Sequence, residues 1–131
     1  MGERRRSGLV LIIEDDEPIL RVLRDVVVDV IGADAHAVTS PDLVSDSQAP
    51  DLVITDLIGR DVHEPVGGRA YLSRMRARFG ATPILLLTAQ QWARSGTHAL
   101  PVDAVVLKPF DVDELAACVR QLLGARRRPA A

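Results

Sequence analysis

The sequence LVLIIEDDEP, at residues 9–18, sets five apolar residues directly before four acids and a proline. The apolar run at 9–13 is too short for a helix and is typical of a β-strand that is buried on both faces. Pro18 favours the first turn of a helix, and apolar residues then repeat at helical spacing over 19–30 until Gly32 ends the pattern. The segment therefore predicts a strand, an acidic turn and a helix in succession.

The same alternation of strand and helix continues along the chain. Further strands are predicted at residues 35–38, 52–55, 83–87 and 104–107. Between them the sequence predicts a short helix that starts at Ser40-Pro41-Asp42 and closes before Pro50, a long loop over 59–68, a helix over 69–79, an irregular segment over 90–101, and a final helix capped by Asp111 or Asp113. Alternating strands and helices imply a parallel sheet with helices on both faces. We predict an α/β fold, a doubly wound five-stranded sheet of the flavodoxin-like order 2-1-3-4-5.

Length and composition limit what this fold can carry. The chain has 131 residues, 47% of them apolar and 3% aromatic, and a formal net charge of −2. We expect one folded domain over 9–124, between a basic tail at 1–8 and a basic tail or linker at 125–131. The small net charge gives no reason to expect direct nucleic-acid binding. No apolar run approaches the ~20 residues that span a bilayer, so we expect a cytoplasmic protein without a membrane partner.

Polar residues follow four of the five predicted strands at the point where each apolar run stops. They are Glu14, Asp15 and Asp16 after the first strand, Asp56 after the third, Thr88 after the fourth and Lys108 after the fifth. Lys108 is the only lysine in a chain whose other basic residues are all arginine. Any one of these residues could be an ordinary strand exit. Ligands of doubly wound sheets bind beyond the carboxyl ends of the strands, however, so four coincident polar exits favour a functional site.

The residue types indicate the chemistry of such a site. Two carboxylates about 4 Å apart repel by roughly 4 kcal/mol at an effective dielectric near 20, so a cluster of three needs a cation or a proton. Oxygen ligands from Glu14, Asp15 and Asp56, without histidine or cysteine, suit Mg²⁺ better than zinc. Thr88 and Lys108 can contact a phosphoryl group that shares the metal. An aspartate in this setting can itself attack phosphorus and form an acyl phosphate.

Four segments resemble the signature segments of bacterial two-component response-regulator receiver domains, in the same order. They are VLIIEDDEPIL at 10–20, PDLVITDL at 50–57, LLLTA at 85–89 and LKPF at 107–110. The resemblance covers about residues 9–123. It implies that Asp56 is the phosphoacceptor, and that Glu14, Asp15, Asp56 and the backbone carbonyl of Ile58 bind Mg²⁺ or Mn²⁺. It further implies that Thr88 is the switch hydroxyl, that Lys108 contacts the phosphate, and that the Lys108-Pro109 peptide is cis.

The sequence departs from the family pattern after Asp56, where Leu57-Ile58-Gly59-Arg60 lacks the usual Met-Pro and the Asp-Gly pair that follows, and the loop to Gly67-Gly68 is longer than usual. Ile58 and Gln90 occupy the places that tune hydrolysis of the acyl phosphate in this family, and an isoleucine cannot orient a water molecule. The family usually has an aromatic residue or histidine three positions before the lysine, whereas this chain has Val105, which has one stiff torsion and no ring. The residues for phosphate uptake are therefore present, while the usual signal readout is altered.

The remaining residues that often carry chemistry are expected to be structural. Cys118 lies in an apolar helical run, where a buried and inert thiol is expected. His36, His63 and His98 lack the spacing of metal ligands, and His63 is expected to be exposed in its loop. Trp92 is expected to pack half-buried, with contact to a partner as the alternative.

We therefore expect a phosphoacceptor domain that receives its phosphoryl group from a sensor histidine kinase or a phosphotransfer protein and changes its contacts with an output protein. Such a domain catalyses only its own phosphorylation and dephosphorylation. The alternative, motivated by Val105 and by the missing Met-Pro after Asp56, is a degenerate receiver that acts as a phosphorylation-independent interaction module. A third candidate, a Mg²⁺-dependent phosphohydrolase, is disfavoured because no aspartate stands two residues after Asp56 as general acid. The resemblance also allows a weak homodimer through the final helix.

Overall fold

The computed structural model describes residues 8–95 and 99–127, which form one sheet with helices on both sides. The strands are β1 (Leu9–Ile13), β2 (Asp34–Val38), β3 (Leu52–Thr55), β4 (Ile84–Thr88) and β5 (Ala104–Leu107). The helices are α1 (Glu17–Asp25), which continues as the π-helical segment η1 (Val26–Ile31), α2 (Pro65–Phe79) and α3 (Val112–Arg127). Two single 3₁₀ turns, η2 (Pro41–Leu43) and η3 (Gln91–Arg94), complete the elements.

The five strands are parallel and lie in the order β2-β1-β3-β4-β5, which confirms the predicted topology. The strand ends are in register: Ile13 at the end of β1 pairs with both Val38 and Thr55. Thr88 at the end of β4 pairs with Leu107 at the end of β5. The residues that follow β1, β3, β4 and β5 are therefore brought to one edge of the sheet.

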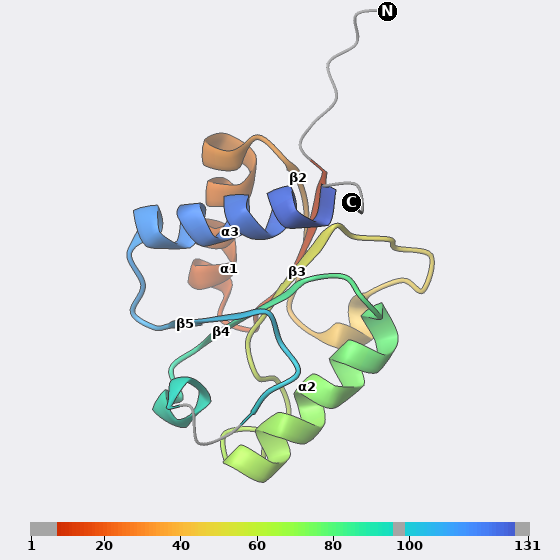
Figure 1. The fold of residues 1–131 in the computed structure, drawn as a ribbon, viewed down its shortest axis with the longest axis vertical. Coiled ribbons are helices and arrows are strands. Elements are labelled where there is room, and N and C mark those ends of the chain that lie inside the picture. The colour runs from red at the N-terminus through yellow and green to blue at the C-terminus, as the bar shows by residue number, and fades with distance from the viewer. Residues whose placement is uncertain (1–7, 96–98, 128–131) are drawn as a thin grey trace, which may run out of the picture.

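The helices divide into two layers, each with its own apolar cluster. Figure 1 shows α1 and α3 on one face of the sheet and α2 on the other. Leu23 of α1 and Leu115 of α3 pack on the first face, against strand residues such as Ile54. Tyr71 and Leu72 of α2 pack on the second. Strand side chains alternate between the two clusters, which is why the sequence shows continuous apolar runs. None of the described helices has the length and apolarity needed to cross a bilayer.

The predicted helix from Ser40 to Pro50 is wrong in extent. Ser40 caps the backbone N–H of Asp42, as expected for a helix start, but only the turn η2 follows. Residues 45–48 are polar, and the Ser45 hydroxyl accepts a hydrogen bond from the backbone N–H of Ser47 at 3.2 Å. Such local side-chain bonds compete with helix formation, and no apolar stripe is present to outweigh them.

The predicted helix over 69–79 begins earlier than expected, at Pro65, which shortens the predicted loop over 59–68. Proline suits the first turn of a helix. The Gly67-Gly68 pair lies within this helix, and glycine is needed there because residues 61–62 and the Trp92 side chain approach closely. A Cβ atom on Gly67 would overlap the carbonyl oxygen of Asp61. The glycine pair therefore marks a close contact, and the sequence-based interpretation of it as loop was wrong.

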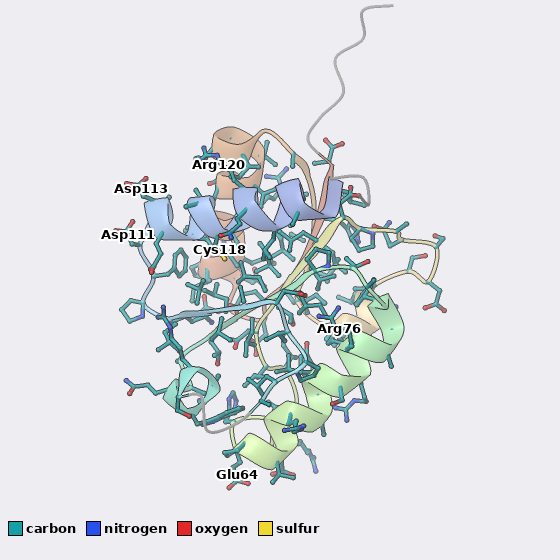
Figure 2. All side chains as sticks on the ribbon, viewed as in Figure 1. Glu64, Arg76, Asp111, Asp113, Cys118 and Arg120 are labelled. Carbon is teal, nitrogen blue, oxygen red and sulfur yellow. The ribbon has the colours of Figure 1, made fainter. Side chains whose placement is uncertain are left out.

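Of the segment predicted to be irregular, the structure describes residues 90–95 and 99–101, which hold only the turn η3. Arg76 of α2 binds the end of this segment (Figure 2). The Arg76 guanidinium donates to the carbonyl oxygens of Pro101 at 3.2 Å and Thr82 at 2.8 Å. It also bonds the Asp103 carboxylate at 2.7 Å, and that carboxylate accepts the backbone N–H of Ile84. One arginine thus joins α2 to the starts of β4 and β5.

The domain limits predicted from sequence are partly covered by the structure. Helix α3 continues to Arg127, three residues beyond the expected domain end at 124. Most of the basic N-terminal tail and residues 128–131 lie outside the described residues. The helix predicted after the first strand ends at Gly32 as expected, because Gly32 has φ 83° and closes η1.

Candidate functional site

Backbone hydrogen bonds of the sheet carry the candidate residues into place. The N–H of Glu14 donates to the carbonyl of Val38 at 3.0 Å, and the N–H of Asp56 donates to the carbonyl of Ile13 at 3.0 Å. The N–H of Lys108 donates to the carbonyl of Thr88 at 2.9 Å. Each of these residues therefore extends the ladder by one position. Their backbones are as firmly placed as the strands themselves.

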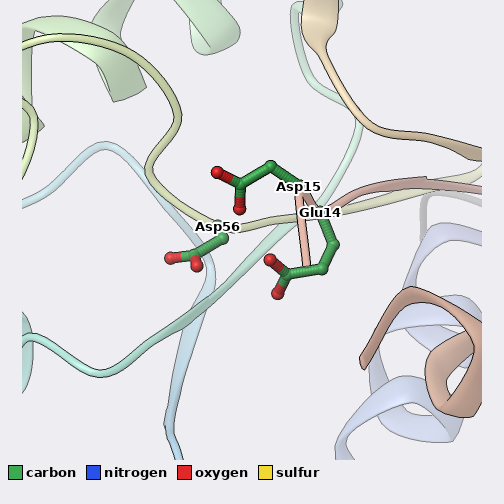
Figure 3. A group of neighbouring side chains, drawn as sticks. All are labelled: Glu14, Asp15 and Asp56. Atoms are coloured by element: carbon green, nitrogen blue, oxygen red, sulfur yellow. The ribbon is translucent and has the colours of Figure 1, made fainter. Parts of the chain in front are cut away.

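Three carboxylates converge at this edge. One carboxylate oxygen from each of Glu14, Asp15 and Asp56 lies within 4.8 Å of the other two. Figure 3 shows Glu14 and Asp15, just after β1, and Asp56, just after β3, turned toward one shared space. Glu14 is buried, Asp56 is half-buried and Asp15 is exposed. The cluster therefore runs from the interior to the solvent, so that a cation could enter from the Asp15 side.

Lys108 reaches across the sheet edge to two of these acids. Its Nζ lies 2.8 Å from Asp56 Oδ2 and 2.7 Å from Glu14 Oε1. Burial alone would lower the pKa of Lys108, but the hydrogen bonds and charges of Asp56 and Glu14 outweigh it and raise the pKa. The ammonium therefore stays charged. The Lys108-Pro109 peptide is cis, as the resemblance implies.

Glu14 is the deepest of the acids and is held by polar contacts on both oxygens. The Glu14 side chain is 1% exposed, and its Oε2 accepts the backbone N–H of Asp16 at 3.1 Å. Burial raises the pKa of Glu14 above its ordinary value, and the ammonium of Lys108 and the Asp16 N–H oppose that rise. The ionised form of Glu14 is therefore costly here and depends on a nearby cation.

The loop after β3 and the turn after β4 are joined beside the site. Trp92 Nε1 donates to the carbonyl of His63 at 2.8 Å, and the indole lies against Gly68 on α2. The side chain of Gln90 lies 3.4 Å from His63 Nδ1. Trp92 is half-buried and His63 is exposed, as predicted. These contacts connect the segment that carries Ile58 with the segment that carries Gln90.

The other predicted site residues lie at or near the same edge. Thr88 is buried, and its hydroxyl oxygen accepts the backbone N–H of Gln90 at 3.2 Å. Ile58 and Val105 are half-buried and pack against the apolar cluster under α2. The structure thus brings Lys108 into contact with Glu14 and Asp56, with Asp15 in the same acidic cluster and Thr88 on the adjacent strand.

Cys118 and His36, which were also predicted to be structural, lie on other elements. Cys118 is half-buried on α3 and packs against the apolar cluster on that face (Figure 2). Burial, with a contribution from the charge of Glu114, raises the pKa of its thiol. His36 lies in β2. His98 lies outside the described residues.

Two buried polar residues at the site were not singled out from sequence. The hydroxyl of Thr55, the last residue of β3, lies 2.8 Å from the phenol oxygen of Tyr71 on α2. The signal was present, because Tyr71 is the chain's single tyrosine and stands on the buried stripe of its helix beside Leu72 and Met75. Buried tyrosine hydroxyls generally find a polar partner.

The donor set fits Mg²⁺ or Mn²⁺. All three side chains offer carboxylate oxygens, as these hard cations prefer. Burial raises the pKa of Glu14 even with Lys108 beside it, so a further cation at this site would stabilise the ionised carboxylate.

Comparisons with known proteins give response regulators among the relatives by sequence, although no family model matches the chain. The regulatory protein AtoC of Escherichia coli is 32% identical over 120 residues, which are 87% of this chain and 25% of AtoC. Protein RcaC of Microchaete diplosiphon is 32% identical over 87% of this chain and 18% of its own length. Response regulator Rre1 of Synechocystis is 38% identical over 60% of this chain and 34% of its own length. The chain thus spans about a third or less of these relatives.

Solved structures share the fold over nearly all of the chain. A bacterial signal-transduction protein, described as a transiently phosphorylated switch, has a TM-score of 0.73 and 24% identity over 95% of this chain and 100% of its own. The signal receiver domain of a histidine kinase from Syntrophus aciditrophicus has a TM-score of 0.70 and 23% identity, over 95% and 96% of the two chains. In the order of its four sequence segments and in its sheet topology, this chain is similar to the receiver domains of response regulators, and a response regulator is among its relatives by sequence.

Proposed function

We propose that this domain accepts a phosphoryl group on Asp56 from the phosphohistidine of a sensor kinase or phosphotransfer protein. The observation that carries the proposal is the position of the Asp56 carboxylate, with Lys108 Nζ 2.8 Å from Oδ2 and the oxygens of Glu14 and Asp15 within 4.8 Å. A carboxylate between an ammonium and an acidic cation site is suited to attack phosphorus. It is the same arrangement of charges that phosphoryl transfer requires, because positioning and charge neutralisation supply most of its catalysis.

The reaction exchanges one bond to phosphorus for another. A carboxylate oxygen of Asp56 forms a P–O bond, the P–N bond to the partner's imidazole breaks, and the imidazole nitrogen leaves with the electron pair and takes up a proton. Hydrolysis later replaces the P–O bond with one to water, which releases phosphate and restores the carboxylate. The domain acts on its own side chain in both steps. We propose no turnover of an external substrate.

Residues around Asp56 would divide the charge of the phosphoryl group. Glu14, Asp15, Asp56 and the Ile58 carbonyl would hold Mg²⁺ or Mn²⁺, which supplies positive charge to the phosphoryl oxygens. Lys108 is already aimed at Asp56 Oδ2 and can contact another phosphoryl oxygen with the same ammonium. Thr88, buried at the end of the adjacent strand, can donate its hydroxyl hydrogen.

A phosphorylation-independent interaction module receives less support from the site. The three acids lie within 4.8 Å of one another, and Lys108 contacts both Glu14 and Asp56. Nothing in the described fold requires a lysine to reach one buried and one half-buried carboxylate at the same edge. Val105 packs against the apolar cluster under α2 and has no ring. It therefore concerns the transmission of the signal to a partner and not the uptake of phosphate. The kinase, the output protein, a weak homodimer and a cytoplasmic location stay predictions.

The test is incubation with a small-molecule phosphodonor and Mg²⁺, followed by intact-protein mass spectrometry. The wild-type chain should gain the mass of one phosphoryl group, and chelation of the divalent ion should abolish the gain. Asp56→Asn should show no gain, because the amide is not a nucleophile, whereas Asp29→Asn, an exposed aspartate on η1, should behave as wild type. Wild-type protein that gains no mass from any donor would contradict the proposal.

A further inference from the structure

The peptide group between Asp56 and Leu57 is held at both of its polar ends. The N–H of Leu57 donates to Asp56 Oδ1 at 2.7 Å. The carbonyl oxygen of Asp56 accepts from the hydroxyl of Thr55 at 2.7 Å. Because the C=O and N–H of one peptide lie in one plane, fixing the carbonyl also fixes the N–H that holds the carboxylate. The direction of the Asp56 side chain therefore depends on the Thr55 hydroxyl.

The Thr55 hydroxyl is in turn directed by Tyr71. The two oxygens lie 2.8 Å apart, and both residues are buried, with exposed fractions of 0% for Thr55 and 2% for Tyr71. A threonine hydroxyl has a single hydrogen, and that hydrogen goes to the Asp56 carbonyl. Tyr71 must therefore be the donor in its bond to Thr55. The phenol keeps its proton over the neutral range, because burial raises the pKa of Tyr71 to about 12.

The two oxygens of the Asp56 carboxylate consequently have different partners. Oδ2 lies against the ammonium of Lys108, and Oδ1 lies against the N–H of Leu57. Lys108 approaches from β5 on a flexible side chain. The N–H, in contrast, belongs to a peptide whose carbonyl is hydrogen-bonded to the buried Thr55 hydroxyl. The hydrogen bonds on the Thr55 side therefore fix the orientation of the Asp56 carboxylate before a phosphodonor binds.

We propose that Tyr71 is a positioning residue for Asp56, acting through the Thr55 hydroxyl and the Asp56-Leu57 peptide. This inference rests on the proposed function of Asp56. The same peptide leads directly to Ile58, whose carbonyl is a proposed metal ligand, so the chain of hydrogen bonds also orients the start of that loop. Without the phenol donor, the Thr55 hydroxyl can rotate toward another acceptor. The Asp56-Leu57 peptide then loses the hydrogen bond to its carbonyl oxygen and keeps only the one from its N–H.

Three variants separate positioning from packing. Tyr71→Phe removes only the phenol oxygen, Thr55→Val removes the hydroxyl with little change in shape, and Thr55→Ser restores a hydroxyl at the same place. Met75→Leu is the matched control, because it changes a buried residue of the same helix without touching the hydrogen-bond chain. Thermal melting establishes that each variant is folded.

The initial rate of phosphorylation by acetyl phosphate, at saturating Mg²⁺, is the functional readout. Tyr71→Phe and Thr55→Val should each lower the rate constant about three- to tenfold, the factor expected for one buried hydrogen bond. The concentration of acetyl phosphate that gives half the maximal rate should stay constant. Thr55→Ser should recover most of the loss, and Met75→Leu should keep the wild-type rate. A Tyr71→Phe rate equal to that of Met75→Leu would overturn the inference.

A second readout does not depend on phosphoryl transfer. Hydrogen exchange of the Leu57 amide, followed by NMR, should be faster by at least the same factor in Tyr71→Phe and Thr55→Val, relative to amides of β4 in the same sample. Binding of Mn²⁺, followed by electron paramagnetic resonance, should weaken in the same two variants. Failure of the wild-type chain to take up phosphate would overturn the proposed function. Unchanged exchange of the Leu57 amide and unchanged Mn²⁺ binding in Tyr71→Phe and Thr55→Val would separately overturn the role of Tyr71.

Discussion

Replacing Lys108 by methionine should destabilise the domain strongly at neutral pH and only slightly in acid. The ammonium lies 2.7 Å from Glu14 and 2.8 Å from Asp56, while the Glu14 side chain is 1% exposed. A pair at this distance attracts by about 6 kcal/mol at an effective dielectric near 20, before desolvation is subtracted. Removing one partner of a buried pair typically costs about 3–5 kcal/mol. We expect about 3 kcal/mol, because Lys108 and Asp56 keep some solvent contact.

The pH dependence follows from the direction of the Glu14 pKa. Burial raises that pKa above its ordinary value of 4.5, and loss of the Lys108 ammonium raises it further. A raised folded-state pKa means that the fold favours the protonated acid. The penalty of the ionised form is therefore small at or below pH 4.5 and grows as the pH rises toward the folded-state pKa. The difference between variant and wild type should shrink to about 1 kcal/mol at pH 4.5.

Thermal melting followed by circular dichroism, at pH 7 and pH 4.5, measures the effect. For a domain of this size, 3 kcal/mol corresponds to a decrease in Tm of roughly 10 °C. Lys108→Arg should recover much of the loss by restoring the charge, and Glu14→Gln added to Lys108→Met should recover it by removing the buried acid. Mg²⁺ should raise the Tm of Lys108→Met more than that of wild type. Equal losses at both pH values, with no recovery in the double variant, would refute the electrostatic reasoning.

Four further substitutions have predicted effects. Ile58→Asn should speed decay of the acyl phosphate several-fold by offering a side chain that can orient water, and an unchanged half-life by mass spectrometry would count against this. Gly68→Ala should cost about 1–3 kcal/mol in urea unfolding and shift the fluorescence of Trp92, since the added Cβ overlaps the indole and lies 2.7 Å from a backbone carbonyl. Gly124→Ala, where nothing lies within 4 Å, should instead stabilise, by up to about 1 kcal/mol. Arg76→Lys should lose about 1–3 kcal/mol in urea unfolding despite keeping its charge, because an ammonium cannot reach the carbonyls of Thr82 and Pro101 at once. Full stability would show that the guanidinium geometry is dispensable.

The strand order and the main site residues could be predicted from sequence because both depend on local signals. Strands buried on two faces give unbroken apolar runs, and a parallel sheet brings every strand end to one edge. Reading the residue after each run therefore found Glu14, Asp56 and Lys108 without any knowledge of distances.

Two of the misses came from tertiary contacts, which local sequence does not reveal. Gly67-Gly68 looks like loop sequence, and only the proximity of Asp61 and the Trp92 indole explains why glycine is needed inside α2. Tyr71 looks like an ordinary core aromatic, and its hydroxyl acquires a role only through Thr55, sixteen positions away. Local propensity carries no information about either partner.

The placement of Asp56 after β3 also bears on the order in which the protein would open. β3 is paired on both sides, and each of its four residues is buried. Edge segments such as η2 consist of a single turn with few backbone bonds, and such segments generally open first. Partial unfolding at the rim would thus leave Asp56 and its ladder bonds intact. Native-state hydrogen exchange should find the Asp56 amide among the last to exchange, at the free energy of global unfolding.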